Sequence, residues 1–432
     1  KNIAKVSFIF ITGQLSYNFI PLHFITTIKS MRKFIISFCC YVFFIFTLAA
    51  QDKAPHYTVI VSLDAFRWDY PAMYDTPNLN QMAREGVKAT MLPSYPASTF
   101  PNHYTLATGL VPDHNGIINN TFWDVKRRRQ YSMGDPATRN NPDYYLGEPI
   151  WITAQKQGVK TGNVYWVGSD IAIKGGYPTY YREYAEKPRL TFEQRVDSTI
   201  ALLEKPEAER PRLVMLYFEE PDGVTHHHGP RSVEAAAIIH RMDSLVGMLR
   251  QGIASLPFGK DVNLIVTADH GMTEISDDRV VDMNKYLRPE WCEAVDGRTP
   301  TSIFTKPEYR DSVYNALKDV PHIHVWKKEE IPVELNYGSS DRIGDIVVAP
   351  ELGWQFTDVP RALKGAHGYF PQSPDMQVMF RACGPDFKAG YESKGFVNVD
   401  IYPLLAHLLK ITPEKTDGQF ERIKDILKDV SF

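Results

Sequence analysis

Apolar runs with the pattern of buried β-strands alternate along this chain with segments that have the pattern of helices. Residues 57–63 (YTVIVSL) are apolar and β-branched on both faces, as in a central strand of a parallel sheet. Residues 160–166, 212–218 and 263–268 are further predicted strands. This alternation predicts an α/β fold, with a mainly parallel central sheet and helices on both faces.

Capping residues and apolar spacing predict the helices between these strands. Thr76 and Pro77 are a suitable N-cap and first helical residue, and Gly86 suits a helix end, so residues 77–85 form a predicted helix. Further helices are predicted over 148–157, 191–204, 231–252 and 399–410.

The pattern changes between about residues 275 and 360. The stretches there have the order strand, helix, strand, strand, in TSIFT, YRDSVYNALKD, HIHVWKK and DIVVAP. We expect a small α+β insert within one large domain over 51–432. Because the insert separates two segments with candidate site residues, we expect it to cover or flank the site.

The N-terminal residues have the pattern of an export signal. From Met31, a short basic region leads into an apolar run that ends in small residues before Gln51. This pattern predicts a signal peptide over 31–50, cleaved near residue 50, and a secreted protein, periplasmic or extracellular. Residues 1–30 resemble extra translated sequence upstream of the true start. A retained membrane anchor is the alternative, but the run is short for a membrane span. A lipoprotein signal at Cys39 or Cys40 is disfavoured by the bulky Phe38.

Charge and cysteine content narrow the function classes. Residues 1–50 hold five of the 48 basic residues and none of the 51 acidic ones, so the remainder has a net charge of −8. Binding to a nucleic-acid polymer is not expected, because it requires a basic surface. Only Cys292 and Cys383 follow the signal. They could pair or remain free thiols, and neither has the spacing of a thiolate zinc site.

Five separate segments place an Asp, a Thr or a His at or just past a strand-like run. In an open α/β sheet, the carboxyl ends of the strands meet at one crevice, where ligands bind. Three Asp, three His and one hydroxyl have the right composition for two divalent metals beside a nucleophile. The sequence therefore predicts a hydrolytic metalloenzyme, with candidate residues Asp64, Thr99, Asp222, His226, Asp269, His270 and His367.

Several of these segments have plain structural alternatives: Asp64 could be an N-cap or turn residue, the histidine run a solvated loop, and His367 a structural histidine. Thr99 precedes a predicted helix that Gly109 ends, and a hydroxyl there lies near free N–H groups and the positive end of the helix dipole. It could equally be an ordinary N-cap residue. Asp222 and His226 are expected on a loop or a single turn between Pro221 and Gly229. The adjacent His227 and His228 leave the identity of the ligating histidine open.

Together these segments resemble the nucleotide pyrophosphatase/phosphodiesterase family of the alkaline phosphatase superfamily. The resemblance runs from Val59 to about Ile426, through TFPNHYTLATGLVPDHNGI, YFEEPD with its following histidines, ADHGM, GAHGY, PDMQVMF and GPDFKAG. The resemblance implies a catalytic domain alone, as in bacterial secreted members. The resemblance implies two Zn²⁺ ions per chain, one held by Asp64, Thr99, Asp269 and His270, the other by Asp222, His226 and His367.

The resemblance also implies roles for residues that bind substrate. It implies that Thr99 is the nucleophile and that Asn120 donates a hydrogen bond to a phosphoryl oxygen. Phe100 and Tyr184 match aromatic positions that sandwich a nucleobase. Two departures from the family pattern occur. Val167 replaces a usual Pro, so the shape of the base pocket does not follow from the resemblance. Thr225 replaces a usual Gly before His226, which keeps His228 as a second candidate.

The predicted function is hydrolysis of nucleotide phosphodiester or pyrophosphate bonds to nucleoside 5′-monophosphates through a covalent Thr99 intermediate. The expected partner is a small nucleotide or another phosphodiester, with no stable membrane span once the signal is removed. The alternatives are a phosphomonoesterase, a phosphonate hydrolase or a choline-phosphodiester hydrolase of the same superfamily. A different class is a non-catalytic zinc-binding protein, which would have no need of the Thr99 hydroxyl.

Overall fold

A computed structural model describes residues 56–357 and 363–430 of the chain. The predicted upstream segment (1–30) and signal peptide (31–50) lie outside the described residues. Within the part that is described, every helix is too short or too polar to cross a membrane. Cys292 and Cys383 are free thiols.

The central sheet is mainly parallel, as predicted. Within the described residues it has nine strands, in the order β18-β2-β17-β8-β1-β7-β5-β6, with β19 beside β2. Only β17 runs antiparallel to its neighbours, β2 and β8. The strands are β1 (Tyr57–Leu63), β2 (Val87–Leu92), β5 (Thr161–Val164), β6 (Tyr180–Arg182), β7 (Leu213–Phe218), β8 (Val262–Thr267), β17 (Val378–Cys383), β18 (Tyr391–Glu392) and β19 (Phe396–Val397).

The three central strands are buried along their whole length. Every residue of β1, β7 and β8 is buried, which explains why these runs are apolar on both faces. Their ends are aligned: Leu63 of β1 lies opposite Phe218 of β7, and Ser62 lies opposite Thr267 of β8. The segments that follow these strands therefore leave the sheet side by side.

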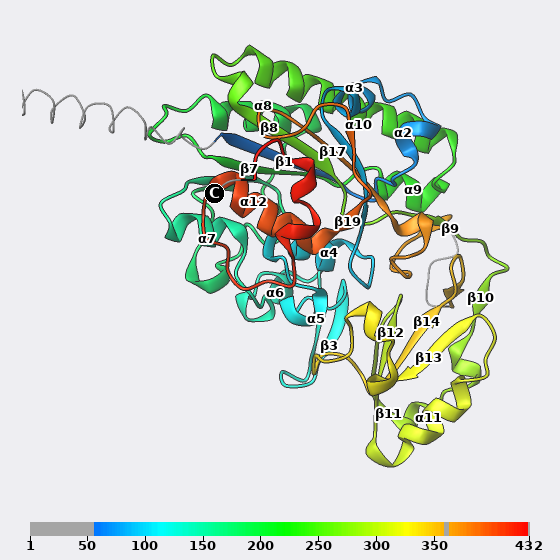
Figure 1. Cartoon of the computed structure of the whole chain (residues 1–432). Helices are drawn as coiled ribbons and strands as arrows, with labels where there is room; N and C mark the ends of the chain where they lie inside the picture. The colour runs from blue at the N-terminus through cyan, green and yellow to red at the C-terminus, as the bar shows by residue number, and fades with distance from the viewer. Residues whose placement is uncertain (1–55, 358–362, 431–432) are drawn as a thin grey trace, which may run out of the picture. The chain divides into compact units, whose positions relative to one another are not determined.

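Helices cover both faces of the sheet (Figure 1). Helices α3 and α8 both contact α10 on one face, and α12 contacts α4 and α7 on the other. Their bounds are α3 (Pro77–Glu85), α4 (Thr99–Thr108), α7 (Ile150–Lys156), α8 (Phe192–Leu203), α10 (Val233–Ser255) and α12 (Ile401–Leu409). This arrangement confirms the predicted fold class.

Residues 275–357 contain a second, smaller sheet with its own core. Its order is β11-β12-β14-β13, and all of its pairings are antiparallel. Helix α11 packs on it through Val313 and Leu317. The sequence pattern did not indicate β11, because its residues alternate between half-buried and exposed for most of its length. The bounds are β11 (Cys292–Gly297), β12 (Thr301–Thr305), α11 (Arg310–Leu317), β13 (Ile323–Lys327) and β14 (Ile346–Pro350).

Candidate active site

The candidate site lies where the carboxyl ends of the central strands meet. Asp64 directly follows β1, and its backbone N–H donates to Phe218 O at the end of β7 (3.0 Å). Asp269 and His270 follow β8 by two and three residues. The loop with His367 is brought alongside by a short antiparallel pairing between β9 (Thr273–Glu274) and β16 (Gly365–Ala366).

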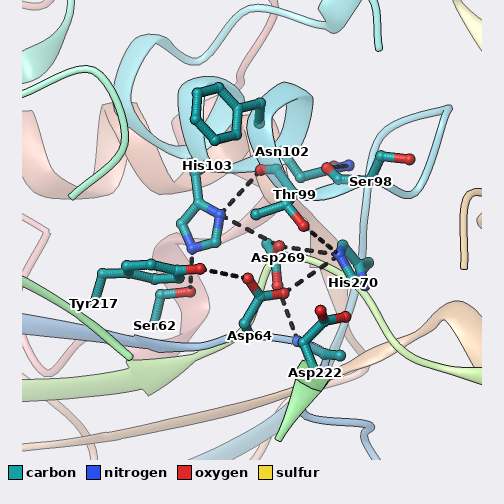
Figure 2. Close-up of polar contacts among 12 residues, drawn as sticks. Ser62, Asp64, Ser98, Thr99, Asn102, His103, Tyr217, Asp222, Asp269 and His270 are labelled. Atoms are coloured by element: carbon teal, nitrogen blue, oxygen red, sulfur yellow. Dashed lines mark hydrogen bonds and ion pairs between the residues drawn. The ribbon is translucent and has the colours of Figure 1, made fainter. Parts of the chain in front are cut away.

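A first group of ligand atoms is fully enclosed. Asp64, Asp269 and His270 are at most 2% exposed, and each offers one ligand atom within 4.8 Å of the others. Thr99 is the first residue of α4, and its Oγ1 lies 3.1 Å from His270 Nε2. Figure 2 shows these side chains converging from the sheet and from the start of α4.

A second group adjoins the first through His270. Ligand atoms of Asp222, His270 and His367 also lie within 4.8 Å of one another. The rings of His270 and His367 stack with centroids 3.8 Å apart. His226 Nε2 lies 3.3 Å from Asp222 Oδ1, and His367 Nε2 lies 3.7 Å from the same oxygen. All seven candidate ligands are thus gathered around two adjoining positions.

Asp222 and His226 lie on a helix, not on the expected loop or single turn. Helix α9 runs over Asp222–His228, and residues four apart on a helix share a face. The local sequence concealed it, because Gly223 and the histidines have low helix propensity. The Glu220 carboxylate, from outside the helix, accepts a hydrogen bond from Val224 N (3.0 Å) in its first turn.

The three adjacent histidines have different surroundings. His226 is half-buried, and its Nδ1 donates to Gly365 O (2.8 Å). His227 and His228 are exposed, and His228 Nδ1 lies 3.7 Å from Glu234. Of the three, only His226 is directed toward Asp222, so the geometry favours it over His228 as a ligand.

The histidines of the site share one orientation. Nδ1 donates to a backbone carbonyl in each: His226 to Gly365 (2.8 Å), His270 to Gly271 (2.8 Å) and His367 to Ala97 (3.0 Å). Such a bond fixes the proton on Nδ1 and leaves the Nε2 lone pair free. In each case Nε2 is the atom near the carboxylates, as metal-ligating histidines require.

Burial opposes charge on most of the ligand set. Burial, reinforced by repulsion from Asp269, raises the pKa of Asp64 well above its usual range, and burial also raises the pKa of Asp269. Burial lowers the pKa of His270 to about 3 and, together with His270 nearby, holds the pKa of His367 well below its usual value. His270 and His367 are therefore neutral and give Asp64 and Asp269 no compensating positive charge.

Asp222 and His226 form the exception. Burial opposes ionisation of both, but their mutual attraction outweighs it, lowering the pKa of Asp222 and raising that of His226 to about 9. A proton on His226 thus neutralises Asp222 in the protein alone. A metal ion at this position would replace that proton.

The polar atoms of the site fit divalent metal ions. Among the described residues, Asp64 Oδ1, Asp222 Oδ1 and Asp269 Oδ2 are buried without a hydrogen-bond partner. Buried carboxylate oxygens in this condition are costly unless a cation compensates them. Carboxylate oxygen and imidazole nitrogen are ligands that suit zinc and neighbouring transition metals. The residues present are therefore a suitable donor set for two such ions.

Asn120 is held with its amide N–H₂ available. The backbone N–H of Phe100, in the first turn of α4, donates to Asn120 Oδ1 (2.9 Å). Because that oxygen is engaged by a donor, the amide nitrogen points elsewhere and remains able to donate. Asn120 is half-buried, so a ligand near Thr99 can reach it.

Two residues that the sequence reasoning missed support the candidate ligands. Tyr217, in β7, donates from its hydroxyl to Asp64 Oδ2 (2.6 Å). His103, one turn after Thr99, is buried, with Nδ1 3.0 Å from Thr99 O and 3.2 Å from Asp269 Oδ2. Its Nε2 lies 2.9 Å from Ser62 Oγ (Figure 2). His103 thereby connects the start of α4 to β1 and to the Asp269 carboxylate.

Removing the Tyr217 hydroxyl is expected to weaken the site. In Tyr217→Phe, Asp64 loses the hydroxyl that donates to its Oδ2, so its orientation is less restricted. Loss of such a supporting bond typically costs about 10–100-fold in metal affinity or activity. Metal affinity measured by competition with a chelator checks this. Tyr104→Phe is the matched control, because that buried hydroxyl has no hydrogen-bond partner in the described residues; equal affinities of the two variants would contradict the role.

Phe100 and Tyr184 both lie half-buried against the main core. Phe100 directly follows Thr99 in α4. The Tyr184 ring is 6.3 Å from that of Tyr217, and the Arg189 guanidinium lies 4.2 Å over it. Tyr217, whose hydroxyl donates to Asp64 Oδ2, therefore lies between the Tyr184 ring and the Asp64 carboxylate. Thr225 is also accommodated: its hydroxyl donates to the carbonyl oxygen of Pro221, the N-cap residue of α9 (2.9 Å).

Comparisons with known proteins point to one family. The sequence model described as type I phosphodiesterase/nucleotide pyrophosphatase matches residues 58–370. The chain is 34% identical over 373 residues to human ectonucleotide pyrophosphatase/phosphodiesterase family member 5, covering 85% of the chain and 77% of the relative. It is 34% identical over 399 residues to a venom phosphodiesterase of Crotalus durissus collilineatus, covering 88% of the chain and 47% of the relative.

Solved structures agree with the sequence comparison. Murine ectonucleotide pyrophosphatase/phosphodiesterase 5 superposes with a TM-score of 0.81 and 34% identity, covering 86% of this chain and 100% of that one. Its inactive threonine-to-alanine variant in complex with AMP gives a TM-score of 0.82, with the same identity and coverage. The chain is also 34% identical over 391 residues to human member 1, and the match covers 86% of this chain. It spans 77% of human member 5 but only 42% of human member 1.

Proposed function

This chain belongs to the type I phosphodiesterase/nucleotide pyrophosphatase family, and on that premise we propose that it hydrolyses nucleotide phosphodiester or pyrophosphate bonds and releases nucleoside 5′-monophosphates. One observation carries the proposal. The Thr99 hydroxyl lies at the start of a helix and 3.1 Å from a buried His270, beside carboxylates with buried oxygens that have no hydrogen-bond partner among the described residues. A packing threonine has no need of such surroundings.

Two zinc ions would be held by the two adjoining ligand groups. Asp64, Asp269 and His270, with Thr99, form one, and Asp222, His226 and His367 form the other. Bound ions would lower the pKa of the Thr99 hydroxyl and neutralise charge on the phosphoryl oxygens.

The residues of the chain perform the remaining steps. The Thr99 oxygen attacks phosphorus in line with the leaving group, forming a bond to the nucleoside phosphoryl group as the bond to the leaving oxygen breaks. The Asn120 amide donates to a phosphoryl oxygen as its charge develops. Water then cleaves the threonine ester, which releases the nucleoside monophosphate and restores the Thr99 hydroxyl.

The nucleotide preference rests on aromatic side chains and on the relatives. Phe100 directly follows the nucleophile, and Tyr184 neighbours Tyr217, so a base held by these rings would lie beside the reacting phosphate. Binding of AMP by the threonine variant of the murine relative supports a nucleoside monophosphate in this site. The expected ligand is a small molecule and not a nucleic-acid polymer. We place the protein outside the cytoplasm, periplasmic or extracellular, on the predicted signal at 31–50.

A substrate panel tests the proposal. Purified zinc-loaded protein should hydrolyse the p-nitrophenyl ester of thymidine 5′-monophosphate at least 100-fold more efficiently than p-nitrophenyl phosphate or p-nitrophenylphosphorylcholine. The reason is that only the first substrate is a phosphodiester that also presents a base to Phe100 and Tyr184. A preference for the monoester or for the choline diester would assign the chain to those activities instead. If the zinc-loaded protein hydrolysed none of the three substrates, the remaining candidate would be a non-catalytic zinc-binding protein.

A further inference from the structure

One turn of the insert reaches the candidate active site. The insert turn, residues 297–300, joins β11 to β12, and β11 contacts β3 (Thr121–Asp124), the strand that begins directly after Asn120 (Figure 1). The sequence pattern predicts that the insert covers or flanks the site but does not identify the residues in contact. The structure supplies them.

The insert turn holds both chain neighbours of Asn120. Asn119 Nδ2 donates to Pro300 O (3.2 Å). The Asp296 carboxylate, just before the turn, accepts from the side chain of Thr121. Asn120 is thus fixed from both sides by the insert while its own Oδ1 is held by the start of α4. The turn must therefore lie close to any phosphoryl group that Asn120 contacts.

The same turn packs on the backbone beside His367. Gly368 has a φ of 99°, and a Cβ placed there would lie 2.5 Å from Thr299 O and 3.0 Å from Thr299 Cβ. A glycine is required for this close approach as well as for the backbone conformation. The insert turn therefore spans from the Asn120 segment to the loop that holds His367.

This position is on the side of the leaving group. In-line displacement puts the leaving oxygen opposite the attacking one, and in two-metal sites each ion stabilises one of the two oxygens. Thr99 lies in the group with Asp64, Asp269 and His270, so with an ion held by each group the leaving oxygen would belong to the side of Asp222, His226 and His367. The turn touches the residue next to His367, so the departing group meets the insert turn as it extends away from the site.

We propose that the insert turn forms the wall of the leaving-group subsite and that Arg298 within it selects anionic leaving groups, such as pyrophosphate or a nucleoside phosphate. This inference rests on the proposed function. Arg298 is exposed, lies between Gly297 and Thr299, and is the one basic residue of the turn. The basic run Lys126–Arg129 follows β3 and does not belong to the turn that contacts Asn119 and Gly368.

The chemistry of the leaving group determines how much Arg298 contributes. Pyrophosphate departs with several negative charges, whereas p-nitrophenolate carries one that is delocalised into its ring. A guanidinium is suited to phosphate oxygens because it stays charged and binds them in a bidentate way. An exposed contact of this kind is weakened by salt.

Charge substitutions at position 298 test the inference. Rates are measured with ATP and with the p-nitrophenyl ester of thymidine 5′-monophosphate. Arg298→Ala should lower the ratio of kcat/KM for ATP to that for the ester by about five-fold. Arg298→Glu should lower it further, because attraction becomes repulsion, and high salt should diminish both effects. Arg288→Ala is the matched control, an exposed arginine near the other end of β11. An unchanged ratio in Arg298→Glu, or an equal fall in Arg288→Ala, overturns the inference.

Binding provides a readout that does not require turnover. In a Thr99→Ala background, calorimetry should give a weaker Kd for ATP when Arg298 is also replaced, with the change for AMP much smaller, because AMP lacks the leaving group. Equal changes for ATP and AMP would overturn the inference. If the wild-type protein hydrolyses neither substrate, the proposed function fails, and this binding comparison alone decides the role of Arg298.

Discussion

Thr99→Ala is expected to lower kcat/KM for a nucleotide phosphodiester by about 10⁴-fold or more while leaving zinc content nearly unchanged. Loss of a nucleophile removes the covalent pathway altogether, and losses of this size are typical when one is deleted. Zinc remains because Asp64, Asp269 and His270 still supply three ligand atoms within 4.8 Å of one another. Steady-state kinetics and metal analysis of the same preparation check the two parts.

Two further variants separate chemistry from packing. Thr99→Ser keeps the hydroxyl and should retain measurable turnover. Thr108→Ala, at the other end of α4, deletes a buried threonine whose hydroxyl donates to Tyr104 O (2.8 Å) and should not lower kcat/KM comparably. Near-normal rates in Thr99→Ala would show that a different group attacks phosphorus. Loss of zinc from that variant would instead make Thr99 an essential ligand.

Those site residues that directly follow buried strands were predictable from the sequence. Asp64 and Asp269 follow runs that are apolar on both faces, and a parallel arrangement of such runs brings their ends together. His367 was predicted as a further residue at or just past a strand-like run. The short β9–β16 pairing that places it beside His270 has two residues in each strand, too few to leave a pattern.

Contacts between distant segments were not predictable. Tyr217 is a β7 residue with the appearance of a core tyrosine, and only the register between β1 and β7 shows that its hydroxyl reaches Asp64. His103 likewise resembles a packing residue in α4. Periodicity specifies which face of an element is buried, but not which polar atom it meets there. The supporting bonds of the site are therefore known only from the fold.

The insert illustrates the same limit at a larger scale. A change in sequence pattern identified it, and its place between the Asp269 and His367 segments suggested that it flanks the site. Its contact with the site depends on β11, a strand without a clear apolar alternation, and on Asn119 and Gly368, which are remote in sequence. Substrate preference could therefore not be derived from the metal motifs alone.

Removal of metal is expected to abolish turnover and to lower thermal stability at neutral and alkaline pH. Binding to the folded state alone stabilises a protein by RT ln(1 + [L]/Kd), about 4 kcal/mol when the free metal exceeds its Kd 1,000-fold. Without metal, Asp64 and Asp269 share a buried space without a compensating cation. Treatment with a chelator should therefore eliminate activity and lower Tm by several degrees, and added zinc should restore both.

The loss of stability on removal of the metal should grow as the pH rises from about 6.5 to 9. Asp64 and Asp269 have raised pKa values in the folded protein, so the stability that they contribute when protonated is lost as the pH rises. His226, with a pKa of about 9, acts in the same direction, because its favourable charge is lost on deprotonation. His270 and His367 have lowered pKa values in the folded protein, so their effect on the pH dependence of stability has the opposite sign. This effect is confined to pH below about 6.5, where the two histidines become protonated in the unfolded chain.

Thermal melts of chelated and zinc-loaded protein across this range check the pH dependence. Each group that has released its proton in the unfolded chain but not in the folded one contributes about 1.4 kcal/mol per pH unit. The difference in Tm between the two forms should accordingly widen with pH. Asp64→Asn is the matched variant, because it removes one of the two carboxylates that repel each other; its metal-free form should melt with a weaker dependence on pH. If the difference in Tm stayed constant from pH 6.5 to 9, burial of these carboxylates without metal would not destabilise the protein. The metal assignment would then lose its energetic support.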